Sequence, residues 1–313
     1  MTERRYQGKL QTLLFFFLLL LSVFLLLHTT EIALATQSGL RLCFYVIIPS
    51  LFPFLILSQL FVPLVPHGKN EKNALFSKLF RLPTVGKSAL LLGFISGFPI
   101  GAKTIAELYT DGALSSEEAT RLLSFCNNTG PAFLIGGVGA LFHSVQFGVF
   151  LYLSEILLSL LTGFLLGRGK SVSCSDKASE KKLFVRNSPS LVDAIAKSGA
   201  AILKICSFVV AFQIFIGIFD IFFQNTVITA SFSAFFEVGT AVSRAAECLS
   251  LSPSLAAAIA AFSVSFSGIS VFLQSEAFLR EAGLSFLPAI PAKILQGVGA
   301  SILAFFFTPF FFQ

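Results

Sequence analysis

Residues Ser88–Tyr109 read SALLLGFISGFPIGAKTIAELY, and this stretch decides the fold. It is apolar, yet it makes a poor continuous helix, because Gly93, Gly97 and Gly101 recur every four residues and Pro99 lies among them. Each flanking piece would be about 15 Å long as a helix, roughly half of a ~30 Å hydrocarbon core. We therefore expect a re-entrant hairpin near 88–109, with two half-helices joined at Gly97–Gly101.

The tip of this hairpin has two interpretations. Irregular backbone at membrane depth survives only where protein or a water-filled cavity satisfies it, and free N–H groups at a half-helix start suit an anionic or polar ligand. The glycines could instead form a GxxxG packing face. A Walker A loop is excluded, because no strand precedes the segment and its second glycine comes one position early. The binding candidates here are Gly97, Pro99, Gly101 and Lys103.

Composition places the chain in a membrane. Hydrophobic residues make up 55% of the sequence and charged residues 12%, with a mean hydropathy of +0.85, which excludes an ordinary soluble globule. The first apolar run is too long for a signal peptide and lacks a cleavage site, so we expect an uncleaved span. The expected apolar spans are Leu10–Leu27, Leu40–Val65, Pro131–Phe142, Phe147–Leu166, Ala200–Phe223 and Phe286–Phe312.

Basic residues orient these spans. Lys and Arg cluster at the N-terminus, between 69 and 87, and between 168 and 186. By the positive-inside rule all three clusters are cytoplasmic, so the N-terminus is expected inside. The polar segment 168–190 reads as a cytoplasmic linker. It separates an N-terminal span and external loop (1–38) and a first half (39–167) from a second half (191–313).

The two halves share short matches in the same order. Arg41-Leu42-Cys43 resembles Lys204-Ile205-Cys206, residues 94–97 resemble 265–268, and residues 112–115 resemble 283–285. The charge pattern gives the halves opposite orientations. An inverted repeat of this kind is typical of secondary transporters, whose broken helices bind substrate near the midplane. We therefore expect an all-α polytopic protein with an inverted repeat and a second re-entrant hairpin near 253–278.

Polar residues at helix breaks supply further candidates. Asn127, Asn128 and Thr129 precede Gly130-Pro131 in an apolar context, where amides are costly unless they bind a ligand or each other. Both alternatives remain open. Ser115 and Glu118 form a capping-box pattern that starts the preceding helix.

The second half offers an acid and a serine-rich tip. Glu237 is flanked by aromatic residues, which favours a ligand-binding or cation-coupling group, unless it pairs with Arg244. Four serines surround Gly268, and we take Ser265, Ser267 and Gly268 as binding candidates. The remaining cations of the apolar segments, Lys204 and Lys293, are expected to snorkel, an alternative also open for Lys103.

No enzyme chemistry emerges from the sequence. The five cysteines form no CxxC pair, and the three histidines lie just beyond apolar runs. We expect no metal site, no cofactor and no catalytic residues, since no nucleophile–base pair is present.

Two motifs carry a family resemblance. Gly93-Phe-Ile-Ser-Gly-Phe-Pro-Ile-Gly-Ala-Lys103 and Ser124-Phe-Cys-Asn-Asn-Thr-Gly-Pro131 resemble the sporulation integral membrane proteins of the YlbJ type, found in endospore-forming bacteria. The resemblance spans nearly the whole chain. That family is grouped with Gate, or nucleoside-recognition, domains and is similar to concentrative nucleoside transporters and to the membrane part of ferrous-iron transporters.

The comparison with nucleoside transporters follows the chain in order. Residues 114–118 and 129–140 resemble their segment after the first hairpin, and Phe236-Glu237 resembles their Asn-Glu-Phe motif, whose Glu helps to hold the ribose. Residues 265–269 resemble their second hairpin tip, which contributes a serine to binding. Their Gln-Thr-Glu-Ala/Ser-Pro motif has no counterpart at 97–103, and Phe236 replaces the Asn.

These features predict a sporulation-associated protein of the cell membrane. The leading hypothesis is a permease that moves a small polar solute, nucleosides among the candidates, by alternating access. The alternative is a non-transporting scaffold or interaction protein of the spore envelope. Expected partners are membrane lipids, a small polar solute, a coupling cation and further copies of the chain, whereas nucleic acid is not expected.

Overall fold

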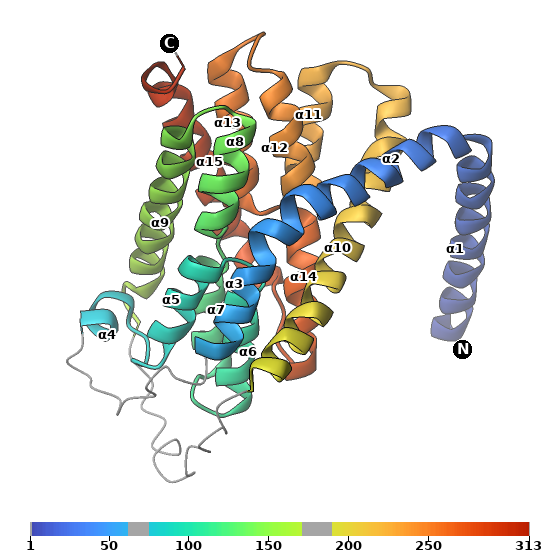
Figure 1. Cartoon of the computed structure of the whole chain (residues 1–313). Helices are drawn as coiled ribbons and strands as arrows, with labels where there is room; N and C mark the ends of the chain where they lie inside the picture. Colours follow the sequence, from blue (N-terminus) through green and yellow to red (C-terminus); the bar gives the residue numbers. More distant parts are fainter. Residues whose placement is uncertain (1, 62–74, 171–189, 313) are drawn as a thin grey trace.

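The computed structural model describes residues 2–61, 75–170 and 190–312, and these form a bundle of helices without any strand (Figure 1). The all-α prediction is confirmed. The expected linker 168–190 lies almost entirely outside the described residues. The first half consists of α1 (Thr2–Leu27), α2 (Thr29–Leu42), the π-helical turn η1 (Cys43–Ile47), α3 (Ile48–Phe61), α4 (Leu75–Phe80), α5 (Gly86–Ser96), α6 (Ile100–Thr110), α7 (Ser116–Cys126), the π-helical η3 (Ala132–Val138), α8 (Gly139–Leu141) and α9 (Val145–Gly167).

The second half contains fewer and longer elements. Its long helix α10 crosses the whole bundle in Figure 1. The elements are α10 (Leu191–Phe222), α11 (Thr226–Phe236), α12 (Val238–Glu247), α13 (Pro253–Phe266), α14 (Gly268–Leu279), the 3-10 turns η5 (Arg280–Ala282) and η6 (Leu287–Ala289), α15 (Ile290–Phe307) and the 3-10 turn η7 (Thr308–Phe310).

Side-chain caps explain where several helices begin. Ser115 and Glu118 form the predicted capping box at the start of α7. The Ser252 hydroxyl accepts a hydrogen bond from the backbone N–H of Leu255, and Pro253 opens α13. Asn225 caps α11 in the same way, accepting from the first free N–H groups of the helix.

Five of the described helical segments are long and apolar enough to cross a membrane. They match four of the expected spans, although the segment through α2 and α3 starts earlier, and the joined α13 and α14 add a further segment. The apolar part of α1 and the helix over Ala132–Leu141 are shorter. The five segments are Thr29–Leu57, Val145–Gly167, Leu191–Phe222, Pro253–Ala282 and Leu287–Phe310.

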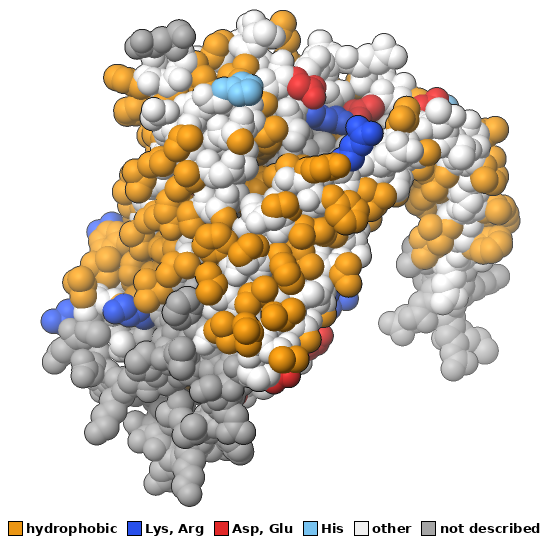
Figure 2. Space-filling model, in the orientation of Figure 1, with side chains coloured by type: hydrophobic (Ala, Val, Ile, Leu, Met, Phe, Trp, Pro, Cys, Tyr) orange, Lys and Arg blue, Asp and Glu red, His pale blue; other side chains and the backbone are white. Residues whose placement is uncertain are grey.

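Apolar side chains cover the surface that lipid would contact. In Figure 2 they occupy most of the middle of the visible face, and charged side chains lie toward its ends. On α9, Leu153, Leu157 and Leu161 are about half to three-fifths exposed (59%, 60% and 49%) and recur every four residues. This spacing puts them on one outward stripe of the helix, as expected for a lipid-facing surface.

The same succession of elements occurs twice along the chain. In each half a long helical segment (α2 with α3, then α10) is followed by two short helices packed side by side (α5–α6, then α11–α12). A helix interrupted by a break comes next (α7 to η3, then α13 to α14), followed by a final long helix (α9, then α15). In Figure 1, α5 and α6 lie in the lower part of the bundle, and α11 and α12 in the upper part.

The second hairpin therefore differs from the one expected near 253–278. There, α13 packs along α15, whereas α14 packs against α6, α10 and α11. The two form an interrupted helix because Ser267 and Gly268 both adopt left-handed backbone (φ 77° and 72°) and redirect the chain without folding it back. The helices of the second half that do fold back on each other are α11 and α12, with Glu237 between them.

Candidate functional site

The first break, residues 127–130, is held by side chains from several helices. Asn127 Nδ2 donates to Ser275 Oγ on α14 at 3.1 Å, and Thr129 Oγ1 donates to the Val264 carbonyl on α13 at 2.8 Å. Asn128 Nδ2 donates to the Phe125 carbonyl at 2.8 Å. The three polar side chains are buried, so the alternative of interhelical hydrogen bonding describes them in this structure.

Two charged residues that the sequence analysis did not select also bind this break. Lys293 on α15 is fully buried (0% exposed), and its Nζ donates to Asn128 Oδ1 at 2.9 Å. The expectation that Lys293 snorkels is wrong, because its ammonium lies inside the bundle. Glu155 on α9 is 2% exposed, and its Oε1 accepts from the Thr129 backbone N–H at 2.7 Å.

The first hairpin packs directly on this break. An added Cβ at Gly93 would lie 1.9 Å from the Cys126 carbonyl oxygen, and one at Gly97 would lie 2.5 Å from the Gly130 nitrogen. Gly101 approaches the same Cys126 carbonyl. The glycine repeat is therefore the packing face that the alternative interpretation predicted. Lys103 is half-buried on α6 and does not line the cavity described below.

The second hairpin carries Glu237 at its tip. The carboxylate accepts from Gly239 N at 3.0 Å and from Thr240 N at 2.6 Å, and so caps the first turn of α12. The alternative that Glu237 pairs with Arg244 is not what the structure shows, because the Arg244 guanidinium binds Asp220 on α10. Glu237 itself is buried, with 4% of its surface exposed.

The second break has few side-chain hydrogen bonds. Ser263, Ser265 and Ser267 are buried, and their hydroxyls have no hydrogen-bond partner among the described residues. Gly268 faces the tip of the second hairpin, since an added Cβ would lie 3.1 Å from the Phe236 carbonyl oxygen. Each hairpin tip thus packs on the break that follows it in the chain.

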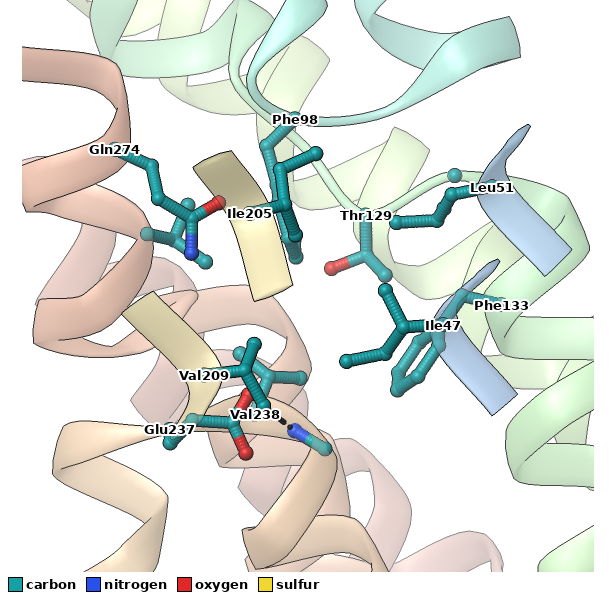
Figure 3. A pocket seen from close by; sticks show the side chains of 13 residues that line it. Ile47, Leu51, Phe98, Thr129, Phe133, Ile205, Val209, Glu237, Val238 and Gln274 are labelled. Carbon is teal, nitrogen blue, oxygen red and sulfur yellow. Dashed lines mark hydrogen bonds between the residues drawn. The ribbon is translucent and has the colours of Figure 1, made fainter. Parts of the chain in front are cut away.

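A cavity of about 30 Å³ lies between the two hairpin tips. Phe98 from the first tip and Glu237 from the second border it, together with Thr129 of the first break (Figure 3). Gln274 on α14 completes the polar lining, and its Oε1 has no hydrogen-bond partner among the described residues. The other lining residues are Ile47, Leu51, Gly130, Phe133, Ile205, Val209, Val238, Gly239 and Val271.

The cavity is acceptor-rich within an apolar wall. In Figure 3 the oxygens of Gln274, Thr129 and Glu237 lie around the cavity space, with Ile205 and Val209 between them. A few convergent polar groups on an apolar surface are typical of small-molecule sites. Oxygen acceptors favour a ligand that donates hydrogen bonds or carries positive charge.

The structure brings together only part of the predicted site. Thr129 and Glu237 line the cavity, whereas Asn127 and Asn128 are bound within the network behind it. None of the four first-hairpin candidates, Gly97, Pro99, Gly101 and Lys103, lines the cavity, and neither do Ser265, Ser267 and Gly268 at the second break. The hairpin tip contributes Phe98, the residue that precedes Pro99 through a cis peptide bond.

Fold, surface and buried polar centre define a multi-pass integral membrane protein. The chain is 29% identical to the sporulation integral membrane protein YlbJ of Bacillus subtilis (strain 168), in an alignment that covers 94% of this chain and 82% of that protein. This similarity supports the relationship with YlbJ-type proteins drawn from the two motifs. No protein-family profile matches the chain, and no solved structure matches it.

Proposed function

We propose that this protein is a permease of the cell membrane of an endospore-forming bacterium and moves a small polar solute by alternating access. The observation that carries the proposal is the cavity between Phe98 and Glu237, which lies where the tips of two separate hairpins meet. A site shared by two hairpins can open to either side when one hairpin moves against the other. The sporulation role rests on the similarity to the sporulation protein of Bacillus subtilis.

An inverted repeat is part of this proposal. The repeated order of elements supports it, as do the matching contacts of Gly97 with Gly130 and of Gly268 with Phe236. The two hairpins lie toward opposite ends of the bundle in Figure 1, as re-entrant hairpins entering from opposite membrane faces would. The N-terminus is proposed to be cytoplasmic on the positive-inside rule.

The size of the cavity indicates which conformational state the structure represents. A water molecule needs about 10–15 Å³ of cavity volume, so a cavity of about 30 Å³ holds one or two waters and no nucleoside. Solute entry then requires a hairpin to move away. The same small volume also favours the second candidate function, a membrane scaffold that keeps the fold but transports nothing.

Uptake into proteoliposomes tests the proposal. Purified protein is reconstituted, and uptake of nucleosides, amino acids and spore-core metabolites is compared for the wild type and for Glu237→Gln. Glu117→Gln is the matched control, because it makes the same chemical change at an exposed residue at the start of α7 that does not line the cavity. We expect uptake by the wild type and the control and at least a tenfold lower rate for Glu237→Gln.

Two results would contradict different parts of the proposal, the first the role of Glu237 and the second transport itself. Uptake that is the same in wild type and Glu237→Gln would remove Glu237 from the mechanism. No uptake of any tested solute, by protein shown to be folded, would favour the scaffold.

A further inference from the structure

Lys293 and Glu155 are charged residues buried inside the bundle that take no part in lining the solute cavity. They lie on α15 and α9, two helices that pack against each other. A charge inside a membrane bundle is costly unless an opposite charge and hydrogen bonds compensate it. Their presence therefore needs a physical reason.

Both charges bind consecutive residues of the first break. The Lys293 ammonium donates to Asn128 Oδ1 at 2.9 Å, and the Glu155 carboxylate accepts from Thr129 N at 2.7 Å. Asn128 Oδ1 also accepts from Ser159 Oγ on α9 at 2.9 Å. A cation and an anion thus bind neighbouring residues of the same helix break.

The first break contains groups of the kind that bind a metal cation: the Asn128 amide oxygen that accepts from the ammonium, the Ser159 hydroxyl and the Glu155 carboxylate. Amide oxygen, hydroxyl and carboxylate are ligands of hard cations, and helix breaks in membrane proteins commonly use them for this purpose. Glu155 Oε2 is buried and has no hydrogen-bond partner among the described residues, so an acceptor oxygen remains available at the site. The lysine ammonium is a compact point charge that can take the place of such an ion.

We propose that Lys293 is a built-in cation, whose ammonium stands at the first break in place of a bound metal ion, with Glu155 as its counter-charge. The proposal goes beyond transport, because it holds equally for a permease and for a scaffold. It implies that the wild-type fold needs no Na⁺ or K⁺. It also implies that removal of the ammonium creates a site for one.

The experiment compares thermal unfolding in sodium chloride and in choline chloride at equal ionic strength, with purified protein in detergent micelles. We expect the wild type to have the same Tm in both salts. In choline, Lys293→Ala should unfold at a lower temperature than the wild type. Sodium should raise the Tm of this variant by roughly 2–4 °C, the shift that a modest binding free energy produces in a chain of this length. Lys293→Ala combined with Glu155→Gln should show no sodium effect, because the counter-charge is gone.

A second comparison covers the case in which Lys293→Ala does not fold. Lys293→Met fills the space without a charge, and its combination with Glu155→Gln removes both charges. If the charges compensate each other, the double variant is more stable than the Lys293→Met single variant.

Three outcomes would overturn the proposal. The first is a wild type whose Tm rises in sodium, which would mean that the break already binds a metal ion. The second is a folded Lys293→Ala that is indifferent to the salt. The third is a double variant no more stable than Lys293→Met.

Discussion

The two helix breaks occupy corresponding places in the two halves, but they are built from different chemistry. At the first, the side chains of Asn127, Asn128 and Thr129 all make hydrogen bonds, and two charged residues add to them. At the second, the hydroxyls of Ser263, Ser265 and Ser267 have no partner among the described residues. The first break is therefore held by α9, α13, α14 and α15, although Asn127 Oδ1 and Glu155 Oε2 have no partner among the described residues, whereas the second break has hydroxyls free to bind something else.

The difference indicates that the two breaks have different roles. A largely satisfied polar network is rigid, because each member loses a hydrogen bond when another moves. Unpartnered buried hydroxyls are a cost that a ligand or a conformational change can relieve. We infer that any opening of the cavity begins at the second break, because the hydrogen bonds of the first break tie the two halves together.

The largest effect is expected from Asn128→Leu. The substitution keeps the number and branching of side-chain heavy atoms but leaves the Lys293 ammonium without its acceptor, and breaking a buried charge interaction costs about 3–5 kcal/mol. The free energy of unfolding, measured in detergent, should fall by that amount. Asn225→Leu, which removes a cap at the start of α11, is the control and should cost about 1 kcal/mol. Equal losses in the two variants would mean that the first break is not specially fixed.

A smaller loss is expected from Gly93→Ala. The new methyl would overlap the Cys126 carbonyl and push the first hairpin off the break, and overpacking of this kind costs about 1–3 kcal/mol or more. Gly199→Ala is the matched control, because α10 has nothing within 4 Å of that position. Tm should fall for Gly93→Ala alone. An unchanged Tm would show that the hairpin is not seated on the break.

Ser267→Gly should leave stability nearly unchanged. Ser267 has a φ of 77°, a conformation that glycine adopts without strain, and this gain offsets the larger entropy of the unfolded chain to within about 1 kcal/mol. The variant also removes a hydroxyl that no described residue binds. We expect an unaltered Tm in detergent. A Tm drop as large as that of Gly93→Ala would mean that the second break is as fixed as the first.

The smallest effect is expected at the surface. Glu117 at the start of α7 forms an ion pair with Lys170 at 2.8 Å, and the Lys170 ammonium lowers the pKa of this carboxyl. A lowered folded-state pKa adds stability above the carboxyl's unfolded pKa, and that stability is lost as pH falls through the folded value. Because the pair is exposed, Glu117→Gln should give no measurable change in Tm at neutral pH. A clear loss would show that surface pairs matter as much as the buried charges of the first break.

The fold was largely predictable from composition and helix punctuation. The apolar spans, the capping box at Ser115 and the hairpin turn at Gly97–Pro99 all follow from local sequence. The structure matches four of the six expected spans, with shifted ends, and has the predicted capping box and turn. The second hairpin was placed at the wrong segment, because serines around Gly268 read as a turn. The chain turns instead at Glu237, which is neither glycine nor proline. The Glu237 carboxylate marks the end of one helix and the start of the next by capping α12.

The buried charges could not be assigned from local sequence alone. Lys293 follows a proline near the start of the last span, where a lysine ordinarily reaches the interface, and its burial depends on Asn128, 165 residues away. Glu155 had a usable signal. It lies mid-span on α9, on the same face as Leu151 and Ser159, whose spacing of four residues marks an inward stripe opposite the exposed leucines.

The capping role of Glu237 has a consequence for how ligand occupancy could be detected. Its two oxygens already bind the first N–H groups of α12, so a ligand that draws the carboxylate away from α12 would release one of these amides. The freed amide would then exchange with deuterium faster, and the first turn of α12 would fray. Deuterium uptake at Gly239 and Thr240 would therefore respond to a bound solute directly, even for a molecule whose passage across the membrane is too slow to follow.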